Sequence, residues 1–339
     1  MKKNLCIFIG YTSFTSHKYG TEIAIINLSK HLSRKYNVFI VTLANDDVIF
    51  THDYIYLNYK EINNTTFDVL IISRYINYFT YCFFKCSKTY LWIHDVHTLA
   101  YFKSMSFEDN GKALLHHVLS RIDKIILLSD WHKCYFQSYY HIPDKKIKVI
   151  GNGIHVSDFL PLEISKKQKN RFIWTSCLTR GIERCIRIIE ILHETFPDVE
   201  LHIFRDFNEN NYQEFVQPYI YFHGKLTNQE VIEEFKKSDF WFYPTTFHET
   251  FCISALEAQM AGCIAISTDV GSLNTTVGNH GVLLDNTLSE SDIAAKVMNI
   301  MKNEDLKKIL RTKGEKWARE QDWSLITKKW FKLFRRFFW

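Results

Sequence analysis

The sequence predicts a two-domain α/β protein in which each domain is built on a parallel β-sheet. Short apolar runs alternate with helical periodicities along the whole chain, a pattern typical of parallel sheets. The chain has 339 residues, more than one hydrophobic core usually serves. An Asn-Gly turn at Gly151-Asn152-Gly153 marks the expected crossover between the two halves.

The amino-acid composition indicates a globular protein and argues against some kinds of partner. Hydrophobic residues make up 46% and charged residues 23% of the chain, as in globular proteins, and the net charge of +5 is too small to indicate nucleic-acid binding. The eight cysteines show no C-x-x-C spacing, so we expect reduced thiols and no zinc motif. No apolar run is long enough to span a bilayer, and we expect a cytoplasmic protein.

The first half contains alternating strands and helices. Leu5–Ile9, ended by Gly10, is read as a first strand instead of a signal peptide, and the apolar periodicity of Thr21–Lys35 predicts a helix. The other expected strands are Val38–Leu43, Tyr54–Leu57, Asp68–Ser73, Thr89–Ile93, Lys124–Ser129 and Ile147–Ile150, with helices at Leu114–Ser120 and from Asp130, as the cap, to Tyr139.

Gly20-Thr21-Glu22 opens the first helix. A helix N-terminus binds phosphate well, and Gly20 would let a ligand approach the backbone closely. A plain strand-to-helix connection with Thr21 as the N-cap is the alternative.

The polar run His94-Asp95-Val96-His97 directly follows the strand Thr89–Ile93. Polar side chains at the carboxyl end of a buried parallel strand are placed to contact a ligand. A metal site and a structural His–Asp pair are alternatives, but no third histidine follows at metal-ligand spacing, so we expect no metal.

The second half repeats the alternation after a basic connector, Lys166–Lys169, which we expect to be flexible. Thr227 and Glu230 have the spacing of a capping box and predict a helix that ends at Ser238. The other expected elements are strands at Phe172–Thr175, Glu200–Phe204, Ile220–Phe222, Phe240–Tyr243 and Cys263–Ser267, and helices at Ile182–Phe196, Phe251–Ala261 and Ser291–Lys302.

The stretch from Phe240 to Thr268 reads as strand, loop, helix, strand. The helix N-terminus would face the ligand edge of the sheet, where phosphate binds. Glu249 lies just before this helix and Glu257 lies along it, so both carboxylates could accept hydrogen bonds from ligand hydroxyls. Arg180, beside Gly181, could pair with a diphosphate. The alternative is an ordinary βαβ unit with exposed glutamates and a surface arginine.

Glu249 and Glu257, separated by seven residues and followed by Ala258 and Gly262, resemble the E-x7-E signature of the retaining glycosyltransferases of family 4. This resemblance implies the GT-B fold, with two Rossmann-like domains facing a central cleft. Residues 1–153 would form the acceptor-side domain and residues 154–322 the nucleotide-sugar-binding domain. The aromatic and basic segment 323–339 would form a helix that packs back on the first domain.

The resemblance implies transfer of a sugar, with retention of configuration and without metal or cofactor, from a nucleotide sugar, most often a UDP- or GDP-sugar. Glu249 would position the sugar, Glu257 would bind the ribose, His94 would contact the transferred sugar, and Arg180 would complete the catalytic set. Asp95 and His97 would lie on the acceptor side. The implied donor-binding residues are Gly20, Arg180, Gly181, His223, Gly224, Thr250, Phe251, Cys252, Ile253, Ser254 and Glu257.

The sequence departs from the family pattern at three positions. Arg180 stands where the family has lysine, Thr175 stands where it has arginine, and Gly20 is single where a pair of glycines is common. The missing arginine at Thr175 makes a non-catalytic nucleotide-sugar-binding scaffold of GT-B fold an alternative function. A nucleotide-sugar epimerase is a second alternative, because it would share the GT-B fold and also bind a nucleotide sugar.

The expected partners are the donor and a glycan, lipid-linked or protein-linked acceptor, without nucleic acid. The segment Trp323–Trp339 interleaves aromatic and basic residues, which would also suit peripheral contact with an anionic membrane surface.

Overall fold

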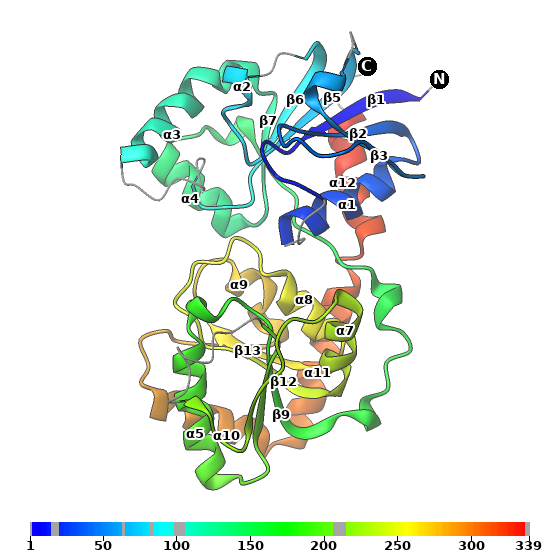
Figure 1. The fold of residues 1–339 in the computed structure, drawn as a ribbon. Helices are drawn as coiled ribbons and strands as arrows, with labels where there is room; N and C mark the ends of the chain where they lie inside the picture. The colour runs from blue at the N-terminus through cyan, green and yellow to red at the C-terminus, as the bar shows by residue number, and fades with distance from the viewer. Residues whose placement is uncertain are drawn as a thin grey trace. The chain divides into compact units, whose positions relative to one another are not determined.

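The computed structural model describes residues 2–14, 20–62, 65–81, 84–97, 106–205 and 215–335 (Figure 1). The chain divides into two compact units. Unit 1 is formed by the described residues of Met1–Gly153 and Trp323–Trp339, and unit 2 by those of Ile154–Asp322.

Unit 1 contains one sheet, whose strand order within the described residues is β3-β4-β2-β1-β5-β6-β7-β8. Every strand pairs in parallel with its neighbours except β3, which is antiparallel to β4. The strands are β1 (Lys3–Phe8), β2 (Tyr36–Thr42), β3 (Ile49–Phe50), β4 (Ile55–Asn58), β5 (Phe67–Ser73), β6 (Cys86–Trp92), β7 (Lys124–Leu127) and β8 (Ile147–Val149), and the helices are α1 (Gly20–Leu32), α2 (Tyr78–Tyr81), α3 (Ser106–Val118), α4 (Asp130–Tyr140) and α12 (Trp323–Arg335).

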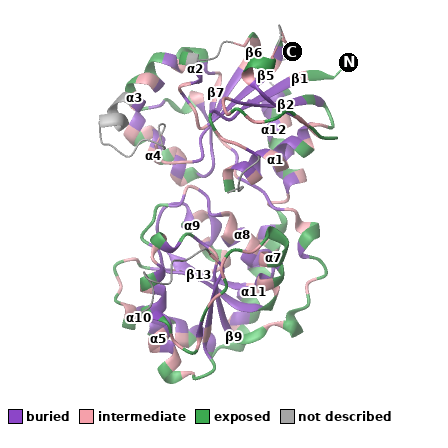
Figure 2. Ribbon diagram, in the orientation of Figure 1, coloured by how far each residue is buried: buried purple, intermediate pink, exposed green. Residues whose placement is uncertain are grey.

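Both faces of the unit 1 sheet are covered, as parallel sheets require. The central strands are buried (Figure 2). Successive residues of a strand point to opposite faces, so Leu91 joins the core cluster that contains Phe136 and Tyr140 of α4, whereas Trp92 packs on α12. Trp92 and Trp330 meet edge to face, with ring centroids 5.1 Å apart.

The terminal helix α12 forms the second apolar layer of unit 1. Trp330, Leu333 and Phe334 are buried, and Phe334 contacts the rings of Tyr36 and Tyr90. Lys328 and Lys329 lie on the exposed side of the same helix. The last four residues of the predicted helix, 336–339, lie outside the described residues.

Unit 2 is a parallel sheet with the strand order β11-β10-β9-β12-β13-β14 within the described residues. The strands are β9 (Gln168–Trp174), β10 (Glu200–Ile203), β11 (Ile220–Phe222), β12 (Ser238–Tyr243), β13 (Ile264–Thr268) and β14 (Val282–Leu284), and the helices are α5 (Ile182–Thr195), α7 (Asn228–Lys237), α8 (Ile253–Met260), α9 (Leu273–Thr276), α10 (Glu290–Met301) and α11 (Glu304–Arg319). The predicted capping box of Thr227 and Glu230 is confirmed at the start of α7.

Several local predictions were wrong. The connector Lys166–Lys169 is not free chain, because β9 begins at Gln168 and the Lys167 amine donates to the Ser238 carbonyl over 2.6 Å. Ser129, not Asp130, caps α4 by accepting from the His132 amide. The elements β3, β14, α2, α9 and α11 were not predicted from the sequence.

The Trp330→Ala substitution should lower the free energy of unfolding by about 3–5 kcal/mol, because it removes a fully buried indole from between α12 and the sheet. Leu325→Ala on the same helix is the matched control, since Leu325 is exposed and should change stability by less than about 0.5 kcal/mol. Urea unfolding measures both. Equal stability of the two variants would contradict the packing of α12 on unit 1.

Candidate functional site

The carboxylate of Glu249 lies at the carboxyl end of β12 and is held by two donors. Tyr243, the last residue of β12, donates its hydroxyl to Glu249 Oε1 over 2.7 Å. Arg180 Nη1 donates to the same oxygen over 2.8 Å. Glu249 is only 8% exposed, and such partners offset the cost of removing a carboxylate from water.

The backbone around Glu249 is fixed as firmly as its side chain. The Ser272 amide donates to the Glu249 carbonyl over 2.8 Å, in the loop after β13. Gly271 has a φ of +63°, and a Cβ there would lie 2.7 Å from the Glu249 carbonyl oxygen. The close approach of these two loops therefore requires glycine at position 271.

The loop after β9, which carries Arg180, contacts the loop after β12. Thr245 Oγ1 donates to the Arg180 carbonyl over 2.6 Å, and Gly181 beside it has a φ of +106°. Arg180 follows β9, Thr245 follows β12, and these strands are neighbours in the parallel sheet, so their loops emerge at the same edge. Arg180 and Glu249, which were predicted separately to bind the diphosphate and the sugar, are thus brought into direct contact.

Part of this cluster remains available to a ligand. Within the described residues the side-chain hydrogen bonds of Glu249 fall on Oε1, which leaves Oε2 for a ligand hydroxyl. The Arg180 side chain is 36% exposed, and its guanidinium lies 4.1 Å from the ring centre of Phe247. Burial and the Glu249 charge raise the pKa of Tyr243, so its hydroxyl stays protonated and donates.

The start of α8 lies directly after Glu249 in the sequence. The helix begins at Ile253 and not at Phe251 as predicted, because Cys252 has a left-handed backbone with a φ of 68°. No side chain of the described residues caps this end, which leaves the first-turn amides for a ligand. The side chains of Phe251 and Cys252 are buried, so these residues could contact a donor through the backbone, whereas Thr250, Ile253 and Ser254 are half-buried.

Glu257 lies on the next turn of α8. Burial raises its pKa to about 7. Among the described residues no hydrogen bond or ion pair reaches its carboxyl group, unlike that of Glu249. A ligand that donates hydroxyl groups would supply the missing partners and favour the ionised form.

His223 and Gly224 follow β11 at the edge of the unit 2 sheet. His223 Nε2 lies 2.9 Å from His202 Nδ1, and the His223 ring stacks on Phe204 with centroids 4.5 Å apart. Burial lowers the pKa of His223 and brings that of His202 to about 4, so both rings are neutral near pH 7. Gly224 has a φ of +75° with no atom within 4 Å of a built Cβ.

Three predicted residues of unit 1 lie after β6. His94 is buried, its ring centroid lies 4.3 Å from that of Trp92, and burial, Arg74 and His132 hold its pKa well below 6.5. Asp95 is paired with Arg74, whose Nε donates to Oδ2 over 2.6 Å, so this carboxylate is engaged within unit 1. His97 is half-buried beside them.

The remaining predictions concern the position of Gly20, metal binding and membrane contact. Gly20 is the exposed first residue of α1, and residues 15–19 of its predicted loop lie outside the described residues. The described part of the chain shows no group of three or more His, Cys, Asp or Glu side chains that could hold a metal ion. No described helix is long and apolar enough to cross a membrane.

Four residues that position the predicted side chains were not predicted from the sequence. Tyr243 was read as part of an apolar strand, although its position as the last strand residue before a polar loop was a usable signal. Gly271 and Ser272 were read as a polar strand end without a link to Glu249. Arg74 directly follows β5 and was not linked to Asp95.

Two family descriptions match the chain. The family described as Glycosyltransferase Family 4 matches residues 19–158, and the one described as Glycosyl transferases group 1 matches residues 164–317. A phosphatidyl-myo-inositol mannosyltransferase from Propionibacterium freudenreichii subsp. shermanii is 24% identical over 221 residues. The match covers 63% of this chain and 56% of that relative, so the chain spans little more than half of the relative's length.

Solved structures share the fold at low sequence identity. The sucrose-phosphate synthase of Thermosynechococcus elongatus superposes with a TM-score of 0.77 at 14% identity, over 99% of both chains. Anabaena HepE, solved in complex with UDP, superposes with a TM-score of 0.75 at 13% identity, over 98% of this chain and 100% of that chain. The predicted fold of two parallel α/β sheets of GT-B type is confirmed.

The Glu257→Gln substitution should stabilise the protein more at high pH than at low pH. Burial raises the pKa of Glu257 from 4.5 to about 7. The folded protein is therefore most stable below pH 4.5, where this carboxyl group is protonated, and it loses that stability as the pH rises through 7. Glutamine does not ionise, so the gain should be larger by on the order of 2 kcal/mol at about pH 8 than at about pH 5. Thermal unfolding at both pH values measures it.

The exposed residue Glu183, in the first turn of α5, provides the control variant Glu183→Gln. We expect the same small change at both pH values for this control. A pH-independent effect of Glu257→Gln would contradict the burial of the Glu257 carboxyl group.

Proposed function

We propose a reaction for this chain, which belongs to the glycosyltransferases of family 4. It transfers a sugar from a nucleotide diphosphate sugar, of the UDP or GDP type, to an acceptor hydroxyl with retention of configuration. The matched families support the reaction type, and the UDP-bound structure of HepE supports a UDP-sugar as the first donor to test. The observation that carries the proposal is the cluster of Glu249, Arg180 and Tyr243 beside the uncapped start of α8.

The donor diphosphate would bind at the start of α8. The amides of Ile253 and Ser254 lie in its first turn, and the positive end of the helix dipole favours an anion there. Arg180 has further N–H groups besides the one that reaches Glu249, and the side chain is partly exposed, so it could donate to a phosphate oxygen as well.

The two acidic residues would bind the two sugar rings of the donor. Glu249 Oε2 would accept from a hydroxyl of the transferred sugar, because Arg180 and Tyr243 occupy Oε1. Glu257 would accept from the ribose, which would supply the partners that this half-buried carboxyl group lacks. Donor binding is also predicted for Gly181, His223 and Gly224. In unit 1, the predicted roles are donor binding by Gly20, contact with the transferred sugar by His94, and acceptor contact by Asp95 and His97.

The chemical step needs stabilisation of negative charge more than a strong base. As the bond between the sugar and the diphosphate breaks, its electron pair passes to the diphosphate oxygen, and the acceptor oxygen forms a new bond to the same sugar carbon. The proton of the acceptor hydroxyl passes to the leaving diphosphate. Donors already aimed at the diphosphate lower this barrier without reorganising. Arg180 and the α8 amides are the groups in unit 2 that would act in this way.

Glu249→Gln and Arg180→Ala should each lower kcat/KM for sugar transfer by roughly 100-fold or more, because each removes charge from the cluster around the reacting sugar and diphosphate. Tyr243→Phe removes one hydroxyl from Glu249 and should cost roughly tenfold, the effect expected for a hydrogen bond to a charged group. Transfer is measured with the donor that gives the largest thermal shift among UDP-, GDP- and ADP-sugars.

Tyr219→Phe is the matched control for Tyr243→Phe. Tyr219 lies in unit 2 against the ring of His193 and has no part in the cluster, so its activity should equal that of the unaltered chain. Unchanged turnover in Glu249→Gln or Arg180→Ala would count against the site. Release of a free epimer of the donor, without transfer to any acceptor, would favour the epimerase alternative.

A further inference from the structure

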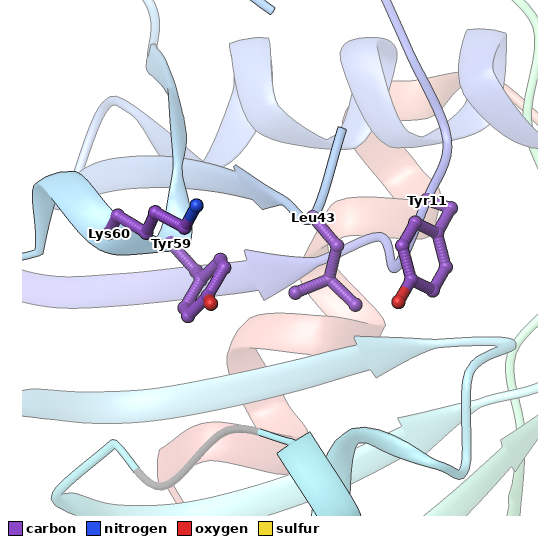
Figure 3. Close-up of a pocket in the computed structure, with 4 residues that line it drawn as sticks. All are labelled: Tyr11, Leu43, Tyr59 and Lys60. Atoms are coloured by element: carbon purple, nitrogen blue, oxygen red, sulfur yellow. The ribbon is translucent and has the colours of Figure 1, made fainter. Parts of the chain in front are cut away.

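Unit 1 contains a pocket that the proposed donor site does not use. It is lined by Tyr11, Leu43, Tyr59 and Lys60 and has a volume of about 180 Å³ (Figure 3). Tyr11 follows β1, Leu43 follows β2, and Tyr59 and Lys60 lie in the 3₁₀ turn after β4. These strands are neighbours in the order β4-β2-β1, so the pocket lies at the carboxyl edge of the sheet, where open α/β sheets bind ligands.

Hydrogen bonds between the strand ends fix the wall that carries Tyr11. Gly10 has a φ of +57°, and a Cβ there would lie 2.2 Å from the ring of Tyr75, so the chain can turn at this point only with glycine. The Leu43 amide donates to the Gly10 carbonyl over 2.7 Å, and Thr42 Oγ1 donates to the Thr12 carbonyl over 2.8 Å. This turn leaves Tyr11 59% exposed.

The opposite wall is fixed by one buried asparagine. Asn58 Oδ1 accepts from the Lys60 amide over 3.0 Å, and Asn58 Nδ2 donates to the Ala44 carbonyl over 2.6 Å. Asn58 thereby links the turn that carries Tyr59 and Lys60 to the loop after Leu43. The backbone that carries the four lining residues is therefore fixed by the fold.

The lining combines two aromatic rings with one positive charge. Leu43 lies between the rings of Tyr11 and Tyr59, whose hydroxyl groups point to the same side of the view (Figure 3). The described residues form no ion pair with Lys60, and Asp46, in the loop after Leu43, is engaged by the hydroxyl of Tyr56. Lys60 is exposed and can therefore attract an anion.

The size of the pocket limits what it can hold. Its volume of about 180 Å³ is below the ~300–1,000 Å³ of pockets for drug-sized ligands, which suits a single ring. Aromatic rings offer apolar faces to the C–H groups of a sugar, and their hydroxyls can pair with its polar edge. A lysine ammonium at the rim favours a substituent of negative charge.

We propose that this pocket binds one sugar ring that carries a phosphate or carboxylate group, and that this ring belongs to the acceptor. The acceptor role rests on the proposed glycosyltransferase function, whereas the binding of an anionic sugar does not. The pocket would select acceptors by a charged ring, in addition to the hydroxyl that receives the transferred sugar.

The binding test uses the full chain without any donor. Ligand-observed saturation-transfer NMR would compare the 6-phosphates of glucose, galactose and mannose, and glucuronate, with the neutral methyl glycosides and with inorganic phosphate. We expect at least one anionic sugar to bind roughly fivefold or more tightly than its neutral counterpart and than inorganic phosphate. Binding of none of them, or equal binding of inorganic phosphate or of the neutral sugar, would overturn the proposal.

Variants assign the binding to the pocket. Lys60→Gln should reduce affinity for the anionic sugar to that of the neutral glycoside, and Tyr59→Ala should weaken both. Lys148→Gln is the control, because Lys148 is exposed on β8 at the opposite edge of the same sheet. Loss of binding in Lys148→Gln, or its retention in both pocket variants, would place the site elsewhere.

Donor binding separates this proposal from the proposed function. Lys60→Gln and Tyr59→Ala should bind a UDP- or GDP-sugar as the unaltered chain does. If the anionic sugar binds at the pocket but no donor binds and no transfer occurs, the proposed function fails while the pocket stands. If donor is used and anionic acceptors react no better than neutral ones, the pocket's acceptor role fails while the function stands.

Discussion

The ion pair between Arg180 and Glu249, completed by the Tyr243 hydroxyl, is the interaction on which the proposed donor site depends. A carboxylate that is 8% exposed would be costly without partners, and here a cation and a hydroxyl both reach one oxygen. The consequence is a carboxylate of fixed position with its second oxygen available. Such fixed polar groups accelerate a reaction because they need not reorganise as charge develops.

The order of strands explains why these residues meet. β9, β12 and β13 are adjacent in the unit 2 sheet, so the loops that carry Arg180, Glu249 and Ser272 emerge side by side although the residues are far apart in sequence. Glycine at position 271 allows two of these loops to touch. In unit 1, the adjacent strands β4, β2 and β1 bring Tyr59, Leu43 and Tyr11 together by the same rule.

Hydrophobic periodicity predicted most of the fold, because strands of a covered parallel sheet must be continuously apolar and helices must bury one face. It predicted the strand, loop and helix around Glu249, and the motif spacing pointed to Arg180 and Glu249. Family membership agrees with the resemblance seen in the E-x7-E spacing. The short antiparallel strand β3 has too few residues to show a period.

Contacts distant in sequence were not predictable in the same way. The partner of Asp95 is Arg74, which follows the neighbouring strand, and spacing along one strand end cannot reveal it. The later start of α8 follows from the left-handed backbone of Cys252, a conformation that few residues other than glycine adopt. Lys167 looked like part of a flexible connector because its buried carbonyl partners come from residues about 70 positions later in the chain.

The crystal structure of the chain with an intact UDP- or GDP-sugar tests the central claim most directly. We expect a hydroxyl of the transferred sugar within hydrogen-bond distance of Glu249 Oε2, with the diphosphate on the amides of Ile253 and Ser254. A bound donor whose sugar does not contact Glu249, or whose diphosphate lies away from the start of α8, would contradict the account.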